Sequence, residues 1–283
     1  MTIVEIVKEG LHHARTRRSL WLFGFFVGVW SGSSNGGGSG PGGGSSLGGA
    51  AMAGSLIPSG GIVAVLASLV LVAAAVFLVL RFVGEGALIE GIVRARRGGV
   101  MTTSEGFRAG WSHWGVLVRI ALLYLGATLG TLALLAGMCV LAWKTIGVAG
   151  TVVLGLLALV GAVPWLVTLY LVQAFAARIA VLEHRRALDA IAKARLFLHG
   201  RLGHGLKLIV ATFLGTLVIS LCATVIILPV ALLLIALLPV VKVVPVIVIA
   251  GLLLVPMACV LTAVLGTFRS SVWTIGYLTQ VEA

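Results

Sequence analysis

Five long stretches of this chain contain no charged residue, and they constrain its fold more than any other feature. They cover residues 19–80, 120–143, 145–177, 208–241 and 243–268. Because ~20 apolar residues of helix cross a hydrocarbon core about 30 Å thick, each of the last four stretches is long enough for one membrane span. None of them comfortably holds two. Since 60% of all residues are hydrophobic and only 10% are charged, the composition excludes a soluble globular protein.

The first uncharged stretch is interrupted by a segment of different composition. A short apolar segment at 19–30 precedes a loop at 31–60, and 16 of the 20 residues from 31 to 50 are Gly or Ser. Such a composition buries no core and behaves as a flexible coil. We therefore predict an all-α, polytopic transmembrane helix bundle of six spans. Its parts are a basic N-terminus at 1–18, a short first span at 19–30, the outer loop, and the main bundle at 61–283.

The first segment has an alternative interpretation. A basic segment ahead of a short apolar run also resembles a secretory signal, with small residues at 50–53 as its cleavage region. Cleavage would leave five spans. Gly24 and Gly28 form a GxxxG pair that lets two helices approach closely, which favours a retained segment. Small residues are also common in membrane helices that have no such contact, so both interpretations stay open.

Lys and Arg are distributed very unequally between the connections. Eighteen lie in 1–18, 81–119, 178–207 and after 268, whereas the other connections hold only Lys144 and Lys242. Because cytoplasmic loops carry the excess of Lys and Arg, both termini are predicted in the cytoplasm. The net charge of +12 is then explained by orientation in the membrane, so we expect no nucleic-acid partner.

The first long cytoplasmic connection predicts a helix that lies at the membrane surface. The preceding span is expected to continue to residue 97, where Gly98 and Gly99 end it. Thr102 and Glu105 then form a capping-box pattern that starts a helix near 102–115. An aromatic stripe flanked by cations suits the headgroup layer, and this helix carries one at Phe107, Trp111 and Trp114.

The second long connection repeats this layout. A span overshoots to about residue 186, a basic amphipathic helix follows near 185–199, and glycines at 200, 203 and 205 precede the next span. The repetition fits a weak internal duplication of span, interfacial helix and span. It fits ordinary membrane-protein patterning equally well.

Several short motifs give the chain a family resemblance. These are Glu183-His-Arg-Arg186, Gly200-Arg-Leu-Gly-His-Gly205 and Trp273-Thr-Ile-Gly-Tyr277, together with the segment from Gly84 to Trp114. Over about the last 200 residues the chain resembles the bacterial glycerophosphoryl diester phosphodiesterase membrane-domain family and its uncharacterised multi-span relatives. The resemblance implies a six-span module in the bacterial inner (plasma) membrane, which some members fuse to a catalytic domain.

No enzyme chemistry is predicted from the residues present. The chain has only eight Asp and Glu and no Asp/Glu/His cluster spaced to hold a metal and activate water. His12 with His13, and His199 with His204, have no nearby Cys or carboxylate set for zinc. The three cysteines lie in predicted spans and are interpreted as packing residues. We expect a non-enzymatic protein without a cofactor or metal.

We expect this module to engage anionic lipid headgroups or to organise a protein partner at the cytoplasmic leaflet. The sequence is also compatible with a homo-oligomer. Simple topology setting by the same cations is the competing explanation. The candidate lipid- or partner-binding residues are Arg94, Arg96, Arg97, Arg108, Trp111, Trp114, Arg185, Arg186, Lys193, Arg195 and Arg201.

The alternative function is a transporter or flippase of a lipid-like or apolar solute. Prolines at 164, 229 and 256 can kink three spans and open a groove between them. Helix packing is favoured over groove lining for a stripe of hydroxyls that recurs every fourth residue, and the same packing role is predicted for Gly126 and Gly130. The stripe comprises Thr212, Thr216, Ser220 and Thr224.

Overall fold

A computed structural model describes residues 3–16, 18–34, 60–200, 202–237 and 243–281, and every element in this part of the chain is helical, as predicted. The predicted Gly/Ser loop, from residue 35 on, and the candidate residue Arg201 lie outside the described residues. The elements in chain order are α1 (Ile3–Thr16), η1 (Arg18–Leu20), α2 (Trp21–Ser34), α4 (Gly60–Arg96), α5 (Thr103–Leu182), α6 (Ala187–Leu198), α7 (Leu202–Leu237) and α8 (Val243–Val281).

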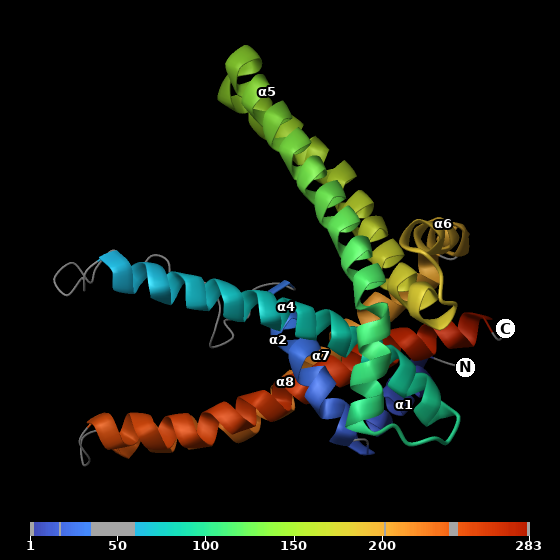
Figure 1. The fold of residues 1–283 in the computed structure, drawn as a ribbon. Helices are drawn as coiled ribbons and strands as arrows, with labels where there is room; N and C mark the ends of the chain where they lie inside the picture. The colour runs from blue at the N-terminus through green and yellow to red at the C-terminus, as the bar shows by residue number, and fades with distance from the viewer. Residues whose placement is uncertain (1–2, 17, 35–59, 201, 238–242, 282–283) are drawn as a thin grey trace.

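Four described helices are long and apolar enough to cross a membrane, namely α4, α5, α7 and α8. The 80-residue α5 is broken at Gly147, where φ is 79° and ψ is −174°. Glycine adopts this positive φ without a Cβ clash. The chain turns back there, so the two halves of α5 lie side by side (Figure 1). One hairpin therefore contains two of the uncharged stretches, 120–143 and 145–177.

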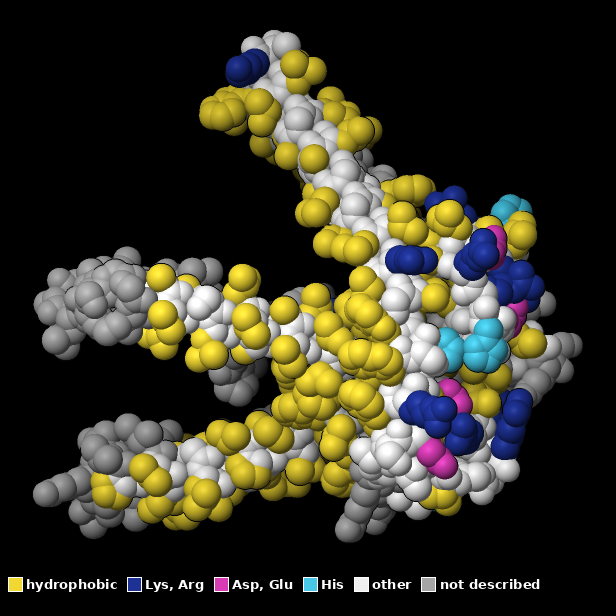
Figure 2. All heavy atoms as spheres, in the orientation of Figure 1, with side chains coloured by type: hydrophobic (Ala, Val, Ile, Leu, Met, Phe, Trp, Pro, Cys, Tyr) yellow, Lys and Arg dark blue, Asp and Glu magenta, His cyan; other side chains and the backbone are white. Residues whose placement is uncertain are grey.

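The apolar helices form three arms that extend from one base (Figure 1). The arms are α4, the α5 hairpin and the α7–α8 pair. Only 6% of the residues in the most apolar window of each of these helices are buried. Hydrophobic side chains cover the arms, whereas most charged side chains and the histidines gather over the base (Figure 2). Such an exposed apolar surface indicates a membrane-embedded protein, and the described arms come together at the base (Figure 1).

The short helix α2 is packed into the base against α8 and α4. A Cβ on Gly24 would collide with the carbonyl oxygen of Ala263, and a Cβ on Gly28 would collide with that of Thr262. Likewise, a Cβ on Gly266 of α8 would collide with the carbonyl oxygen of Gly24. The predicted close helix approach at the GxxxG pair is confirmed, and α8 is the partner.

In the two long connections, the helices end and begin where the sequence predicts, with one difference. Gly98 (φ 80°) follows α4, and the Thr102 amide donates to Oε2 of Glu105 at 3.1 Å within a complete capping box. The helix expected near 102–115 does not end there but continues as the first half of α5. The apolar stretch that follows keeps helical geometry up to Gly147, so nothing stops the helix earlier. The helix expected near 185–199 is α6, which ends just before Gly200 (φ 86°).

Candidate functional site

The carboxylate of Glu183, just after α5, links three elements of the base. It accepts hydrogen bonds from Nζ of Lys193 on α6 (2.6 and 2.8 Å), from Nε of Arg185 (2.9 Å) and from the hydroxyl of Tyr277 on α8 (3.0 Å). Burial alone would raise the pKa of Glu183, but these hydrogen bonds together lower it below its ordinary value of 4.5. The charged carboxylate therefore fixes α6 against α5 and α8.

An aromatic cluster beneath α6 supports the same arrangement. The ring of Phe197 on α6 lies 5.3 Å from that of Phe175 on α5 and 5.5 Å from that of Tyr277, between ring centroids. Phe175 in turn meets Trp273 of α8 edge-on at 5.7 Å. Phe175 and Trp273 are buried. Such aromatic contacts add to the apolar burial that holds α6 in place.

The predicted cations divide into two groups by their partners. Four of them are in ion pairs: Arg94 with Glu90 (2.9 Å) and Glu105 (3.7 Å), Arg96 with Glu9 (3.5 Å), and Arg185 and Lys193 with Glu183. Four others are exposed, and no carboxylate of the described chain lies within ion-pair distance of them: Arg97, Arg108, Arg186 and Arg195. The second group is free to meet an external anion.

The predicted aromatic stripe forms one exposed ladder on the first part of α5. Phe107 stacks on Trp111 with centroids 5.8 Å apart, and Trp111 lies 5.9 Å from Trp114. The three side chains are 43%, 50% and 36% exposed. Arg108 is exposed beside them. Large apolar rings left open next to a cation are typical of a surface that contacts headgroups or a partner.

A cavity of about 330 Å³ lies between α6 and both halves of α5. The α6 residues in its lining are spaced i, i+3, i+4 and i+7, so they share one helix face. Arg195 is the one charged group in a lining of Leu123, Tyr124, Ala127, Leu169, Leu188, Ile191, Ala192 and Arg195. Largely apolar walls with a single cation suit an amphiphile that has a negatively charged end.

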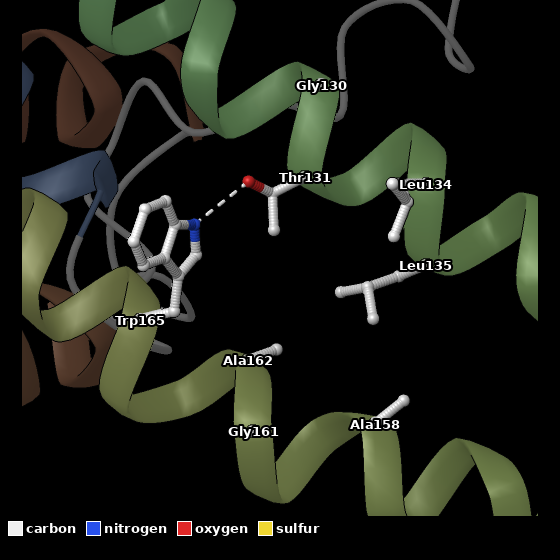
Figure 3. Close-up of a pocket in the computed structure, with 8 residues that line it drawn as sticks. All are labelled: Gly130, Thr131, Leu134, Leu135, Ala158, Gly161, Ala162 and Trp165. Carbon is white, nitrogen blue, oxygen red and sulfur yellow. Dashed lines mark hydrogen bonds between the residues drawn. The ribbon is translucent and has the colours of Figure 1, made fainter.

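A second cavity, of about 460 Å³, lies within the α5 hairpin, and Figure 3 shows Trp165 facing Thr131 across it. Nε1 of Trp165 donates to Oγ1 of Thr131 at 3.2 Å and joins the two halves. A Cβ on Gly126 or Gly130 would meet nothing within 4 Å. The close packing predicted at these two glycines is therefore wrong, because the described helices leave open space beside both. The cavity is lined by Gly130, Thr131, Leu134, Leu135, Ala158, Gly161, Ala162 and Trp165.

The hydroxyl stripe of α7 is bonded within its own helix. Thr212 donates to the Leu208 carbonyl (2.7 Å), and Thr216 donates to that of Thr212 (2.7 Å). Thr224 donates to the carbonyl of Ser220 (2.9 Å). Neither cavity described above is lined by the stripe. Thr212 is buried at the base and Thr224 is exposed on the arm, so the stripe runs from the packed base onto an apolar arm.

A histidine pair at the base was not predicted. Nε2 of His113, on the first half of α5, lies 3.0 Å from Nδ1 of His184, just after α5. Nδ1 of His113 lies 2.9 Å from the Ala109 carbonyl and 2.9 Å from Oγ of Ser112. The pair therefore joins the start of α5 to the segment that follows its end.

Glu183 was also missed as a functional position, although the sequence carries a signal for it. It is one of two acidic residues in a segment, 178–207, that holds seven Lys and Arg. A carboxylate among so many cations is a group that several of them can share. The His113–His184 contact has no such signal, since the two residues are 71 positions apart.

Comparisons with models of known protein families, with curated proteins and with solved structures give no match for this chain. They do not bear on the resemblance to the phosphodiesterase membrane-domain family, which stays a prediction.

Proposed function

We propose that this chain is a non-enzymatic, six-span inner-membrane module that binds an anionic lipid of the cytoplasmic leaflet beside α6. The path of the chain supports the six spans. The α5 hairpin and the α7–α8 pair each run out from the base and back, and α4 returns to the base after α2, which is packed in the base itself (Figure 1). The short first span, α2, has 14 residues and is about 21 Å long.

The observation that carries the lipid proposal is the position of Arg195 in the lining of the cavity between α6 and α5. Arg195 is exposed and has no carboxylate of the described chain within ion-pair distance. Its guanidinium can meet a phosphate while the apolar walls contact an acyl chain. The Glu183 contacts and the aromatic cluster hold α6 in the position that this needs.

The test compares single charge removals on α6 in the full chain, reconstituted in nanodiscs of phosphatidylcholine with phosphatidylglycerol. Arg195→Gln removes the cation at the cavity, whereas Arg186→Gln removes another exposed cation that does not line it. Native mass spectrometry counts the retained phosphatidylglycerol. We expect Arg195→Gln to lower retention by about tenfold, the effect of losing one charge-assisted hydrogen bond. Arg186→Gln should leave it near the wild-type level.

A second variant tests the apolar half of the site. Ile191→Trp fills the cavity and keeps Arg195, so retention should fall although the charge is unchanged. If neither Arg195→Gln nor Ile191→Trp alters retention, the cations of α6 serve topology alone and the lipid proposal is wrong.

A further inference from the structure

Three arginines, one each on α4, α5 and α8, share electrostatic neighbours near the ends of these helices' apolar stretches. Arg81 lies on α4, Arg178 on the second half of α5 and Arg269 on α8. Arg269 and Glu85 are both within electrostatic range of Arg81 and of Arg178. Each arginine directly follows an uncharged stretch, so all three mark the cytoplasmic ends of predicted spans. We call Arg81, Arg178 and Arg269 the inner arginine cluster. It shares no residue with the cavity at α6.

Two charges of this cluster, those of Arg178 and Arg269, have no direct counter-charge among the described residues. Glu85 is the carboxylate within electrostatic range of Arg178. Arg269 donates to the hydroxyl of Tyr170 (2.6 Å), which is neutral. Neither Arg178 nor Arg269 has a carboxylate of the described chain within ion-pair distance. A buried charge without a counter-charge is costly, so an excess of positive charge here calls for an external anion.

Arg178 is the most buried member of the cluster and has an unused donor. Its side chain is 5% exposed and donates one N–H to the Ala174 carbonyl of its own helix. The guanidinium carbon lies 5.7 Å from the ring centroid of Trp273. Nε of Arg178 and Nε1 of Trp273 are both buried without a hydrogen-bond partner. Both groups can only donate, so each of them lacks an acceptor.

The surroundings of the cluster indicate what kind of molecule carries that acceptor. Beyond the cluster, α4, α5 and α8 diverge as separate arms (Figure 1). Their exposed side chains are apolar, for example Leu78 (40%), Trp165 (51%) and Val260 (47%). On the proposed topology the cluster lies at the depth of the inner-leaflet headgroups, while the arms lie among acyl chains.

We propose that the inner arginine cluster is a phosphate-binding site, occupied in the membrane by the headgroup of an anionic phospholipid whose acyl chains lie between the arms. Arg178 and Arg269 donate to the phosphate oxygens, and Arg81 adds positive charge from α4. Guanidinium groups suit this role because their planar donors match phosphate oxygens in pairs. The site is independent of the α6 cavity, so the chain holds two anionic lipids.

The experiment measures phosphatidylglycerol binding by native mass spectrometry of the full chain in phosphatidylcholine nanodiscs. Arg269→Gln removes a half-buried charge, and Arg178→Lys keeps the charge but removes the Nε donor. We expect each to weaken one of two bound lipids by at least about tenfold. Lys144→Gln, an exposed cation outside the cluster, is the matched control and should bind both lipids normally.

The two sites are separated by their variants. Arg195→Gln should release the α6 lipid only, Arg269→Gln the inner lipid only, and the double variant both. If neither Arg195→Gln nor Ile191→Trp has an effect while Arg269→Gln does, the α6 proposal fails and the inner site stands. If Arg269→Gln and Arg178→Lys both bind phosphatidylglycerol like the wild type, the inner site is overturned.

A soluble probe distinguishes the source of the phosphate. Inorganic phosphate is titrated calorimetrically into the wild type in pure phosphatidylcholine nanodiscs. Lipid binding without phosphate binding supports a headgroup as the ligand, whereas phosphate binding that Arg178→Lys abolishes supports the site but assigns it to a soluble anion. Should Arg178→Lys fail to fold, Arg269→Gln and the thermal shift that phosphatidylglycerol gives the wild type decide the question. An absent shift contradicts the proposal.

Discussion

The hydroxyl of Tyr277 on α8 donates a hydrogen bond to Oε1 of Glu183, which lies 94 positions earlier in the chain, across 3.0 Å. The same carboxylate holds Lys193 of α6. One anionic group therefore ties the C-terminal part of α8 to the helix that carries Arg195. The geometry of the proposed lipid site depends on this contact, although Glu183 itself does not line the cavity.

Glu183→Gln should destabilise the base. The amide cannot accept two charge-assisted hydrogen bonds as well as the carboxylate does, and the variant should lose roughly 1–3 kcal/mol of unfolding free energy. Thermal unfolding in detergent, followed by circular dichroism, measures the loss. Asp189→Asn is the matched control because Asp189 is exposed on α6 and makes no ion pair within the described chain. Equal midpoints for the two variants would contradict a structural role of Glu183.

The contribution of Glu183 should depend on pH in a defined direction. Its pKa in the folded protein is below the ordinary value of 4.5, so the folded state binds this proton less readily than the unfolded state. The stabilisation is fully present above pH 4.5 and is lost as the pH falls through the lowered folded-state value. The midpoint difference between wild type and Glu183→Gln should therefore be constant from pH 7 to 5 and shrink below 4.5. A difference that grows on acidification would refute this assignment.

The contact between α2 and α8 predicts opposite outcomes for two Gly→Ala changes. Gly24→Ala adds a Cβ that collides with the Ala263 carbonyl, whereas Gly126→Ala adds one in open space. Overpacking typically costs about 1–3 kcal/mol, while Ala in place of an unpacked helical Gly gains up to about 1 kcal/mol. We expect Gly24→Ala to lower the unfolding midpoint and Gly126→Ala to keep or raise it. A harmless Gly24→Ala would mean that α2 is not packed into the base.

The helices of this fold were predictable because their signals are local. Uncharged stretches of 24 residues or more located α4, α5, α7 and α8, and the capping box at Thr102 and the glycines at 98 and 200 marked helix ends within a few residues. The break inside α5 lies at Gly147, next to the lone Lys144, where the charge pattern already placed an outer turn. Hydropathy and capping act within one or two helical turns, so one sequence is sufficient to show them.

The sites were only partly predictable because they depend on contacts between distant residues. The basic residues of α6 were identified, but their division into paired and unpaired cations depends on where Glu183 lies. Arg178 and Arg269 were counted only as cytoplasmic charges, since nothing in the sequence shows that the ends of three spans share electrostatic neighbours. Gly126 failed as a packing residue for the same reason: a small residue packs closely only where a second helix arrives.

Cysteine labelling should give an inside–inside–outside pattern at three positions, which lie before the first, after the second and after the third proposed span. With the three native cysteines replaced by serine, single cysteines are placed at the exposed positions Lys8, Arg97 and Lys144. In intact cells a membrane-impermeant maleimide should label Lys144→Cys alone, because the α5 hairpin carries that residue to its outer end (Figure 1). Lys8→Cys and Arg97→Cys should react only after lysis, since Lys8 lies on α1 and Arg97 directly follows α4 on the proposed cytoplasmic side. Labelling of Arg97→Cys in intact cells would mean that the proposed orientation is wrong. A mature protein that lacks the Lys8→Cys label after lysis would show that the first segment is cleaved.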